Sequence, residues 1–216
     1  MVRADYYTLL RDFADQKIDI LAGTQILAKG LHFPNVTLVG VISADTSLYV
    51  PDFRANEKTY QLISQVAGRT GRSEKKGTVY LQTFMPDQPA IRFAQKGDFH
   101  AFVTEELKHR KLCSLPPYGR LAVLLLRGAE YESLLAAANQ AKNFIDQTID
   151  ASSLSIKVRG PQDAPISRIQ RSHRIQIILQ SPSASHLITL FNAFRASNPV
   201  KSPIKAFFDM DPVSLL

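Results

Sequence analysis

The chain has 216 residues, of which 45% are hydrophobic and 21% are charged, which suits one or two folded domains and excludes a globally disordered chain. No apolar run is long enough to span a bilayer, and the single cysteine, Cys113, excludes an internal disulfide framework and an all-cysteine zinc site within the chain. The formal net charge of +7 favours a polyanionic partner, nucleic acid before a membrane surface.

The first half of the chain alternates between helical and strand-like patterns. In chain order these are a helix over 5–16, a short apolar run ending in Gly-Thr over 18–24, a continuous apolar run over 36–45, a helix over 54–69 and a strand over 77–85. Such alternation predicts a parallel α/β sheet, whose ligands lie at the carboxyl ends of the strands. Gly23-Thr24, Asp45 and Gly68–Arg72 lie at or near such ends.

A second fold type is predicted for the other half of the chain. It follows an amphipathic helical stretch over 88–112 and the helix-breaking segment Leu115-Pro116-Pro117-Tyr118. The predicted order is strand, helix, strand, strand, helix and strand, over 121–128, 131–149, 154–160, 174–181, 183–196 and 204–211. This βαββαβ order is that of a ferredoxin-like domain, with two helices on one face of an antiparallel sheet.

The predicted fold class is therefore α/β plus α+β. We expect one domain over 1–95, a helical linker over 96–115 and a second domain over 116–216. Three apolar side chains are expected to be buried, Phe207 and Phe208 in the core and Cys113 as a small hydrophobe.

The sharpest motif is Gln65-x-x-Gly68-Arg69-x-Gly71-Arg72. Its glycines allow close approach of the backbone, and its arginines, three residues apart, can point guanidinium groups at the same phosphate. A basic helix end with glycines is the alternative. The motif resembles motif VI of superfamily 2 helicases, in their second RecA-like lobe. The resemblance implies that Arg72 is an arginine finger on the γ-phosphate, with Arg69 beside it. It further implies that Gln65 couples nucleotide to DNA and that Gly68 and Gly71 bind the nucleotide.

A second motif covers residues 23–45. Thr24 follows an apolar run and can offer its hydroxyl and backbone N–H to a phosphate, and Lys29 adds a cation beside Gly30. An ordinary βαβ segment is the alternative. The stretch resembles motif V of the same helicases. This resemblance implies that Thr24, Gln25 and Lys29 bind the DNA backbone and that Gly30 senses both nucleotide and DNA.

Further segments narrow the resemblance. GTQILAKGLHFP, PDFRANEKTYQL and QVAGRTGR, followed by LPPY, RSHRIQIILQ and FFDMDP, are similar to the primosomal protein N-prime family of bacterial replication-restart helicases over essentially the whole chain. The family implies an ATP-dependent 3′→5′ DNA helicase of the bacterial cytoplasm that acts in primosome assembly at stalled forks. A recombination or nucleotide-excision helicase of superfamily 2 would share residues 1–85 but not the second half.

Two elements of such an enzyme are missing from the sequence. It contains neither the phosphate loop G-x-x-x-x-G-K-[ST] nor an Asp-Glu-x-His box. We therefore expect the C-terminal portion of a longer helicase, beginning inside the second RecA-like lobe and inactive as an ATPase alone. The resemblance implies ATP and Mg²⁺, held mainly by the absent first lobe, and Zn²⁺ in the parent only, with no metal in this chain. The implied partners are forked and single-stranded DNA, the single-stranded-DNA-binding protein, other primosome proteins and the replicative helicase loader, and no membrane.

A basic cluster lies between residues 157 and 174, where only Asp163 offsets the positive charge. Its cations are Lys157, Arg159, Arg168, Arg171 and Arg174, with His173 among them. We expect this strand, loop and strand start to contact DNA phosphates through Arg168, Arg171 and Arg174. Docking of an acidic protein tail and a merely solvated loop are the alternatives. A non-catalytic DNA-binding or docking module, with idle helicase motifs, is the alternative function.

Overall fold

The computed structural model describes residues 3–24, 33–68 and 77–215, which form two compact units. Unit 1 contains Met1–Val50 and Arg54–Glu106, and unit 2 contains Pro51–Phe53 and Leu107–Leu216. The division between Glu106 and Leu107 falls inside the stretch that the sequence predicts to be a linker. In the described part of the chain, the helices are too short or too polar to cross a membrane.

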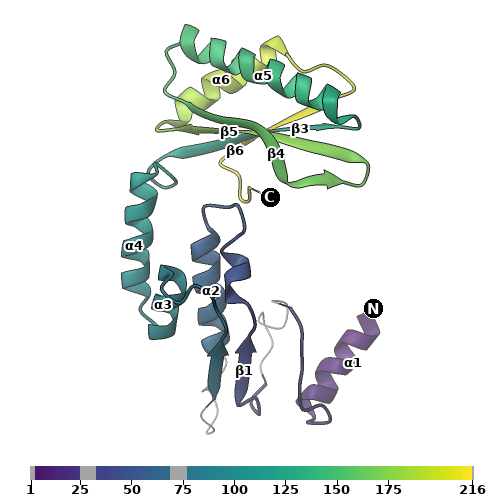
Figure 1. The fold of residues 1–216 in the computed structure, drawn as a ribbon, viewed down its shortest axis with the longest axis vertical. Helices are drawn as coiled ribbons and strands as arrows, with labels where there is room; N and C mark the ends of the chain where they lie inside the picture. The colour runs from purple at the N-terminus through teal and green to yellow at the C-terminus, as the bar shows by residue number, and fades with distance from the viewer. Residues whose placement is uncertain (1–2, 25–32, 69–76, 216) are drawn as a thin grey trace. The chain divides into compact units, whose positions relative to one another are not determined.

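Unit 1 combines helices with a two-stranded parallel sheet (Figure 1). Its elements are α1 (Arg3–Ala14), β1 (Leu38–Val41), the 3-10 helix η2 (Ala44–Ser47), α2 (Ala55–Ala67), β2 (Thr78–Leu81), α3 (Pro89–Lys96) and α4 (Phe99–Leu112), which continues into unit 2. β1 and β2 pair in parallel from Leu38 opposite Thr78 to Val41 opposite Leu81, which confirms the predicted direction. Residues 18–24 form no strand.

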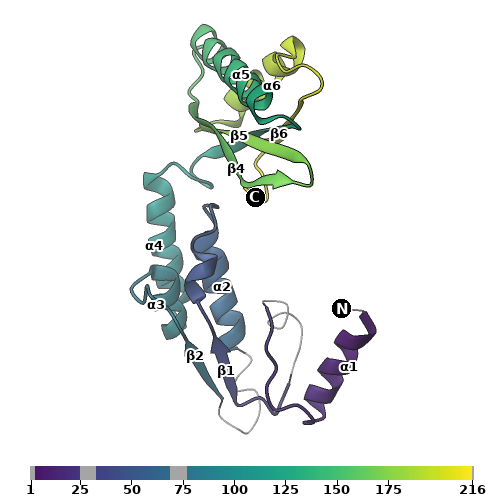
Figure 2. The ribbon, with the colours of Figure 1, turned by 45° about the vertical axis from the view of Figure 1, so that its right-hand side comes forward.

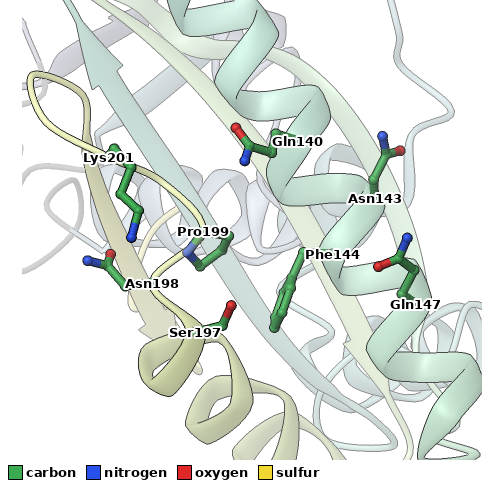
Figure 3. Close-up of a pocket in the computed structure, with 8 residues that line it drawn as sticks. All are labelled: Gln140, Asn143, Phe144, Gln147, Ser197, Asn198, Pro199 and Lys201. Atoms are coloured by element: carbon green, nitrogen blue, oxygen red, sulfur yellow. The ribbon is translucent and has the colours of Figure 1, made fainter.

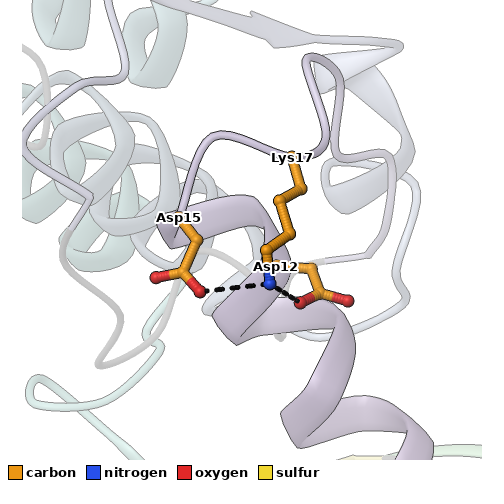
Figure 4. Close-up of polar contacts among 3 residues, drawn as sticks. All are labelled: Asp12, Asp15 and Lys17. Atoms are coloured by element: carbon orange, nitrogen blue, oxygen red, sulfur yellow. Dashed lines mark hydrogen bonds and ion pairs between the residues drawn. The ribbon is translucent and has the colours of Figure 1, made fainter.

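Exposed ion pairs lie at the end of α1. Lys17 follows the helix, and its Nζ lies 3.0 Å from Asp12 Oδ1 and 3.5 Å from Asp15 Oδ2 (Figure 4). The hydrogen bond to Asp12 and the nearby negative charges raise the pKa of Lys17. Because Lys17 is exposed, water screens these pairs and they contribute little to stability.

The core of unit 1 holds α2 in place. One face of α2 buries Tyr60 and Ile63 against Ile91 of α3 and Phe102 of α4. The rings of Tyr60 and Phe102 stack with their centroids 4.3 Å apart. The opposite face of α2 is therefore the one presented to solvent.

The helical stretch predicted over 88–112 is two helices rather than one. Gly97 ends α3 in a left-handed conformation, at φ 66°, and the Asp98 N–H donates to the carbonyl of Phe93 at 3.0 Å, which completes a Schellman motif. Asp98 then caps α4, because its Oδ1 accepts the N–H of Ala101 at 2.9 Å. The Gly-Asp pair thus ends one helix and begins the next.

Unit 2 follows the predicted order of strands and helices. Its elements are β3 (Arg120–Gly128), α5 (Tyr131–Ala151), β4 (Lys157–Ile169), β5 (Ser172–Ser181), α6 (Ala184–Ser197) and β6 (Lys205–Met210). The strands are ordered β4-β5-β3-β6, and each neighbouring pair is antiparallel. α5 and α6 lie together on one face of this sheet (Figures 1 and 2).

Alternation along the central strands places the core of unit 2 between sheet and helices. Leu124 and Leu126 of β3 and Ile177 of β5 are fully buried against Leu134 of α5 and Leu190 of α6. Helix α6 begins and ends with ordinary caps. The Ser183 hydroxyl accepts the N–H of Ser185 at its start, and Asn198 ends it in a left-handed conformation.

Two predictions about burial are wrong. Phe208 packs against the core of unit 2, but Phe207 is 47% exposed, because adjacent residues of a strand point to opposite faces. Cys113 is exposed rather than buried, since it lies in the turn that follows α4.

Candidate nucleotide and nucleic-acid site

Half of the predicted site residues lie in the described part of the chain. Gln25, Lys29, Gly30, Arg69, Gly71 and Arg72 lie outside the described residues. The described ones are Thr24, Gln65 and Gly68 in unit 1 and Arg168, Arg171 and Arg174 in unit 2. The two groups are therefore described separately.

In unit 1, helix α2 determines how the arginine motif begins. Ile63 and Val66 are buried while Gln65, between them in sequence, is exposed. Gly68 ends the helix, and its N–H donates to the Ser64 carbonyl at 2.9 Å. A Cβ on Gly68 would lie 3.3 Å from that same oxygen, so a larger side chain would crowd the turn. The motif therefore leaves a helix that is anchored in the core, with Gln65 open to a ligand from solvent.

Thr24 is also exposed, and it is the last described residue before the second motif. Its exposure to solvent suits the predicted phosphate contact.

The carboxylate of Asp45 has a structural role, because both of its oxygens accept hydrogen bonds within unit 1. It is 2% exposed, and its Oδ1 accepts the Thr83 hydroxyl at 2.6 Å while its Oδ2 accepts the Phe84 N–H at 2.8 Å. Thr83 in turn accepts the N–H of Met85 at 2.9 Å. The Thr83 hydroxyl first, and then the Phe84 amide, lower the pKa of Asp45. This network fastens η2 to the chain that leaves β2.

We expect Asp45→Asn to destabilise unit 1 at neutral pH, because the amide nitrogen of Asn cannot accept the second hydrogen bond. The folded pKa of Asp45 lies below its ordinary value of 3.8, so the stabilisation is complete above that value and is lost as the pH falls through the folded pKa. Thermal unfolding followed by circular dichroism should show a lower melting temperature for the variant than for the wild type, and this difference should disappear in acid. Asp87→Asn, at an exposed carboxylate, is the control, and a difference independent of pH would contradict the assignment.

In unit 2, the predicted basic loop is a β-hairpin. Arg168 of β4 lies opposite His173 of β5, and Ile169 lies opposite Ser172, which leaves a two-residue turn of Gln170 and Arg171. Gln170 has a positive φ of 55°, as tight hairpin turns require. Arg168 and Arg171 are both exposed, so their guanidinium groups can reach an external phosphate.

Arg174 differs from these two arginines. It is only 8% exposed, and its Nη1 donates to the carbonyl oxygen of Ile166 at 3.1 Å. β4 carries a register shift between Asp163 and Arg168, so the strand is irregular where Arg174 meets it. The structure thus gives Arg174 an internal partner, and its side chain holds the irregular strand in place.

Asp163, the acidic residue within the basic cluster, also has a hydrogen-bond partner inside unit 2. Asp163 Oδ1 accepts the Tyr131 hydroxyl at 3.2 Å, and the ring of Tyr131 meets His173 edge to face with centroids 5.6 Å apart. The hydrogen bond to Asp163, followed by its negative charge, raises the pKa of Tyr131. These contacts tie the hairpin to the start of α5 and leave its exposed cations facing solvent.

A cavity of about 420 Å³ lies elsewhere in unit 2, between α5 and the residues that end α6 (Figure 3). It is lined by Gln140, Asn143, Phe144, Gln147, Ser197, Asn198, Pro199 and Lys201. The lining is mostly neutral and polar, and it contains none of the predicted site residues.

Two cations that the sequence did not single out lie on the sheet of unit 2. Arg127 of β3 is directly opposite Arg174, and Lys205 of β6 is directly opposite Arg127. The three residues are far apart in sequence, and only the strand register brings them together. Alternation with core residues along β3 and β5 is the one signal that could have placed Arg127 and Arg174 on a common face.

Two family models match separate parts of the chain. The helicase conserved C-terminal domain matches residues 4–74, and the primosomal protein N C-terminal domain matches residues 111–213. The first match contains both helicase-like motifs, and the second covers nearly all of the sheet and helices of unit 2.

Curated relatives match most of the chain. Replication restart protein PriA of Bacillus subtilis is 42% identical over 182 residues, which is 84% of this chain and 22% of the relative. PriA of Chlamydia muridarum is 37% identical, with 98% of this chain and 28% of the relative covered, and PriA of Rickettsia typhi is 37% identical, with 94% and 31% covered. The chain thus spans less than a third of the length of these relatives. Among solved structures, the match to the de novo designed protein Foldit4 covers 44% of this chain and 97% of the Foldit4 chain. Its TM-score is 0.32 and its sequence identity is 8%, which is too weak a likeness to support an argument.

Proposed function

The chain belongs to the PriA family of replication restart proteins, and on this premise we propose that it works as the C-terminal part of an ATP-dependent 3′→5′ DNA helicase that assembles primosomes at stalled forks. The observation that carries the proposal is the succession, in one chain, of a helicase C-terminal domain with both motifs and a primosomal C-terminal domain. A superfamily 2 enzyme of another kind would share only the first of these.

The helicase unit supplies residues to a nucleotide that is held mainly by the other lobe of the parent. Arg72 acts as the arginine finger, and Arg69 contacts the phosphates or an acidic residue beside them. Gln65, exposed at the end of the anchored helix α2, couples this site to DNA. Gly68 and Gly71, with Gly30 of the earlier motif, allow the backbone to approach the nucleotide.

DNA is held by both units. Thr24, Gln25 and Lys29 bind the backbone in the helicase unit. Arg168 and Arg171 contact phosphates from the exposed hairpin of unit 2, and Arg174 supports that hairpin from inside. This division follows from the exposure of the first two arginines and the burial of the third.

The finer fold assignment is part of the same proposal. Unit 1 is a part of a second RecA-like lobe, which the parallel pairing of β1 and β2 supports. Unit 2 is a ferredoxin-like domain, which is supported by the strand order β4-β5-β3-β6 and by both helices lying on one face.

The parent uses ATP with Mg²⁺ and carries Zn²⁺ outside this chain. Its partners are forked and single-stranded DNA, the single-stranded-DNA-binding protein, other primosome proteins and the replicative helicase loader, and it works in the bacterial cytoplasm. When bound, ATP supplies the phosphoryl group whose transfer to water drives translocation. The described residues fit a place beside it, because Gln65 is open to solvent and Gly68 has no side chain in the way.

We expect the chain alone to show no DNA-stimulated ATP hydrolysis, because it holds arginines but no phosphate loop. Phosphate release would be measured with and without forked DNA, for the chain and for the full-length parent. The parent should hydrolyse ATP and displace a strand when its tracked strand runs 3′→5′. Turnover by the purified chain would contradict the division of roles, and a parent without DNA-stimulated turnover would contradict the proposed function.

A further inference from the structure

Three cations lie side by side across the sheet of unit 2. Arg127 of β3 is flanked by Arg174 of β5 and Lys205 of β6, each directly opposite it. Directly opposed residues of antiparallel strands point to the same face. Their neighbours in sequence, Leu126 and Ile175, are buried in the core under α5 and α6, so the cations point away from the helices. We call Arg127, Arg174 and Lys205 the cation row.

The described part of the chain does not neutralise the cation row. None of its ion pairs involves these three residues. Arg174 is 8% exposed, yet its Nη1 donates to a neutral acceptor, the carbonyl oxygen of Ile166. The backbones of neighbouring strands lie ~4.8 Å apart, so side chains at directly opposite positions leave the sheet within a Debye length of one another. Like charges directly opposite one another destabilise a sheet, and a bound anion would remove that cost.

An exposed aromatic ring adjoins the cation row. Phe207 lies two residues after Lys205 on β6, and it is therefore on the same face, opposite Leu125. It is 47% exposed. Cations that hold phosphates beside a ring that stacks on a base are the combination by which proteins bind single-stranded nucleic acids.

Charge is unevenly distributed over the two faces of unit 2. On the face opposite α5 and α6, the turn after α4 contacts Gln180 at one end of the sheet. On this same face, Arg159 and Lys157 of β4 extend the positive charge of the cation row, and Asp209 of β6 opposes it. The helix layer carries acidic residues among its cations: Glu130 and Glu132 at the start of α5, and Asp146, which pairs with Lys142. A polyanion is therefore drawn to the sheet face rather than to the helices.

We propose that the cation row and Phe207 form a single-stranded DNA site on the face of the sheet opposite α5 and α6, distinct from the exposed hairpin arginines Arg168 and Arg171. Arg127 and Lys205 contact backbone phosphates, and a base stacks on Phe207. The buried Arg174 adds its positive charge without touching the DNA. This site deepens the proposed function, on which it rests for the choice of DNA as the polyanion.

The test measures binding of the full 216-residue chain to fluorescein-labelled oligo(dT) by anisotropy over a series of salt concentrations. The variant R127Q/K205Q should bind more weakly at low salt. Its slope of log K against log salt should become shallower by about 0.7 for each phosphate that the protein no longer neutralises, or about 1.4 in all. R195Q/K201Q removes the same charge from exposed positions on the helix layer and should leave the slope unchanged. Lys205→Gln alone, at an exposed position on an edge strand, repeats the test with less risk to the fold.

Phe207→Leu tests the stacking contact. Binding to oligo(dT) should weaken roughly five-fold or more, whereas binding to an abasic oligonucleotide of the same length should not change. Equal effects on both ligands would overturn the role of the ring.

Other outcomes overturn the site as a whole. These are wild-type affinity and slope in R127Q/K205Q, equal losses in R195Q/K201Q, or competition by polyglutamate as strong as by oligo(dT), which would assign the face to an acidic protein. The ATPase and unwinding assays use the unaltered parent, so they test the proposed function separately from this site. A parent that unwinds DNA while the cation-row variants bind normally would therefore overturn this site alone.

Discussion

Arg72→Ala in the full-length parent should reduce DNA-stimulated ATP hydrolysis by about 10³- to 10⁵-fold, because an arginine finger stabilises charge that develops on the transferred phosphoryl group. Binding of forked DNA should be largely kept, since the proposed DNA contacts lie on other residues. Hydrolysis would be followed by phosphate release at saturating DNA, and DNA binding by anisotropy.

The matched control for this variant is Arg92→Ala, which removes an exposed arginine of α3 outside the motif. It should leave both activities near those of the wild type. Equal loss of hydrolysis and DNA binding in Arg72→Ala would instead give Arg72 a structural role, and hydrolysis at the wild-type rate would remove it from the site altogether.

Gly119→Ala should destabilise unit 2 by about 2–5 kcal/mol. A Cβ on Gly119 would lie 2.1 Å from the carbonyl oxygen of Ser114, which cannot retreat freely because it accepts the Gln180 side chain at 2.7 Å. Any shift large enough to relieve the clash weakens that hydrogen bond at a buried amide, since Gln180 is 4% exposed. The free-energy costs of overpacking and of the weakened hydrogen bond therefore add.

The measurement for Gly119→Ala is urea unfolding of the chain followed by circular dichroism, with hydrogen exchange of peptides from β3 and β5 to assign the change to unit 2. Gly119 lies directly before β3, and Gly128→Ala, at the last residue of β3, is the control. Its Cβ would meet Ile204 and Leu134 at ordinary contact distances of 3.4 and 3.5 Å, so we expect a change within about 1 kcal/mol. Equal stabilities of the two variants would contradict the predicted clash.

The order of the elements could be predicted because it depends on local patterns. Alternation and helical periodicity located the strands and helices of unit 2, and the register confirms the antiparallel pairing of β3 with β5 and β6. The extent of β4 could not be predicted, because Pro161, Pro165 and a run of polar residues resemble a loop. Pairing with β5, a non-local contact, extends the strand to Ile169.

The site residues divide in the same way. The arginine motif is recognisable from residue types and spacing alone, and its functional roles remain predictions. The burial of Arg174 and the pairing of Arg127 with Lys205 depend on strand register, which no local pattern determines. The position of Asp45 at the end of a strand could be predicted, but its partners could not, because a carboxylate there can bind the neighbouring loop as well as a ligand. Phe207 was misjudged because two adjacent aromatic residues cannot both enter the core from one strand.

The strand order of unit 2 leaves β4 and β6 at the edges of the sheet. Exposed edges are where sheets of separate molecules join and aggregate, since their N–H and C=O groups are unpaired. β4 carries two prolines without N–H groups and two register shifts, and β6 is only six residues long and lies between Pro203 and Pro212. Neither edge offers a long, flat template, so the domain is protected against growing into intermolecular sheets when many copies of it meet at high concentration.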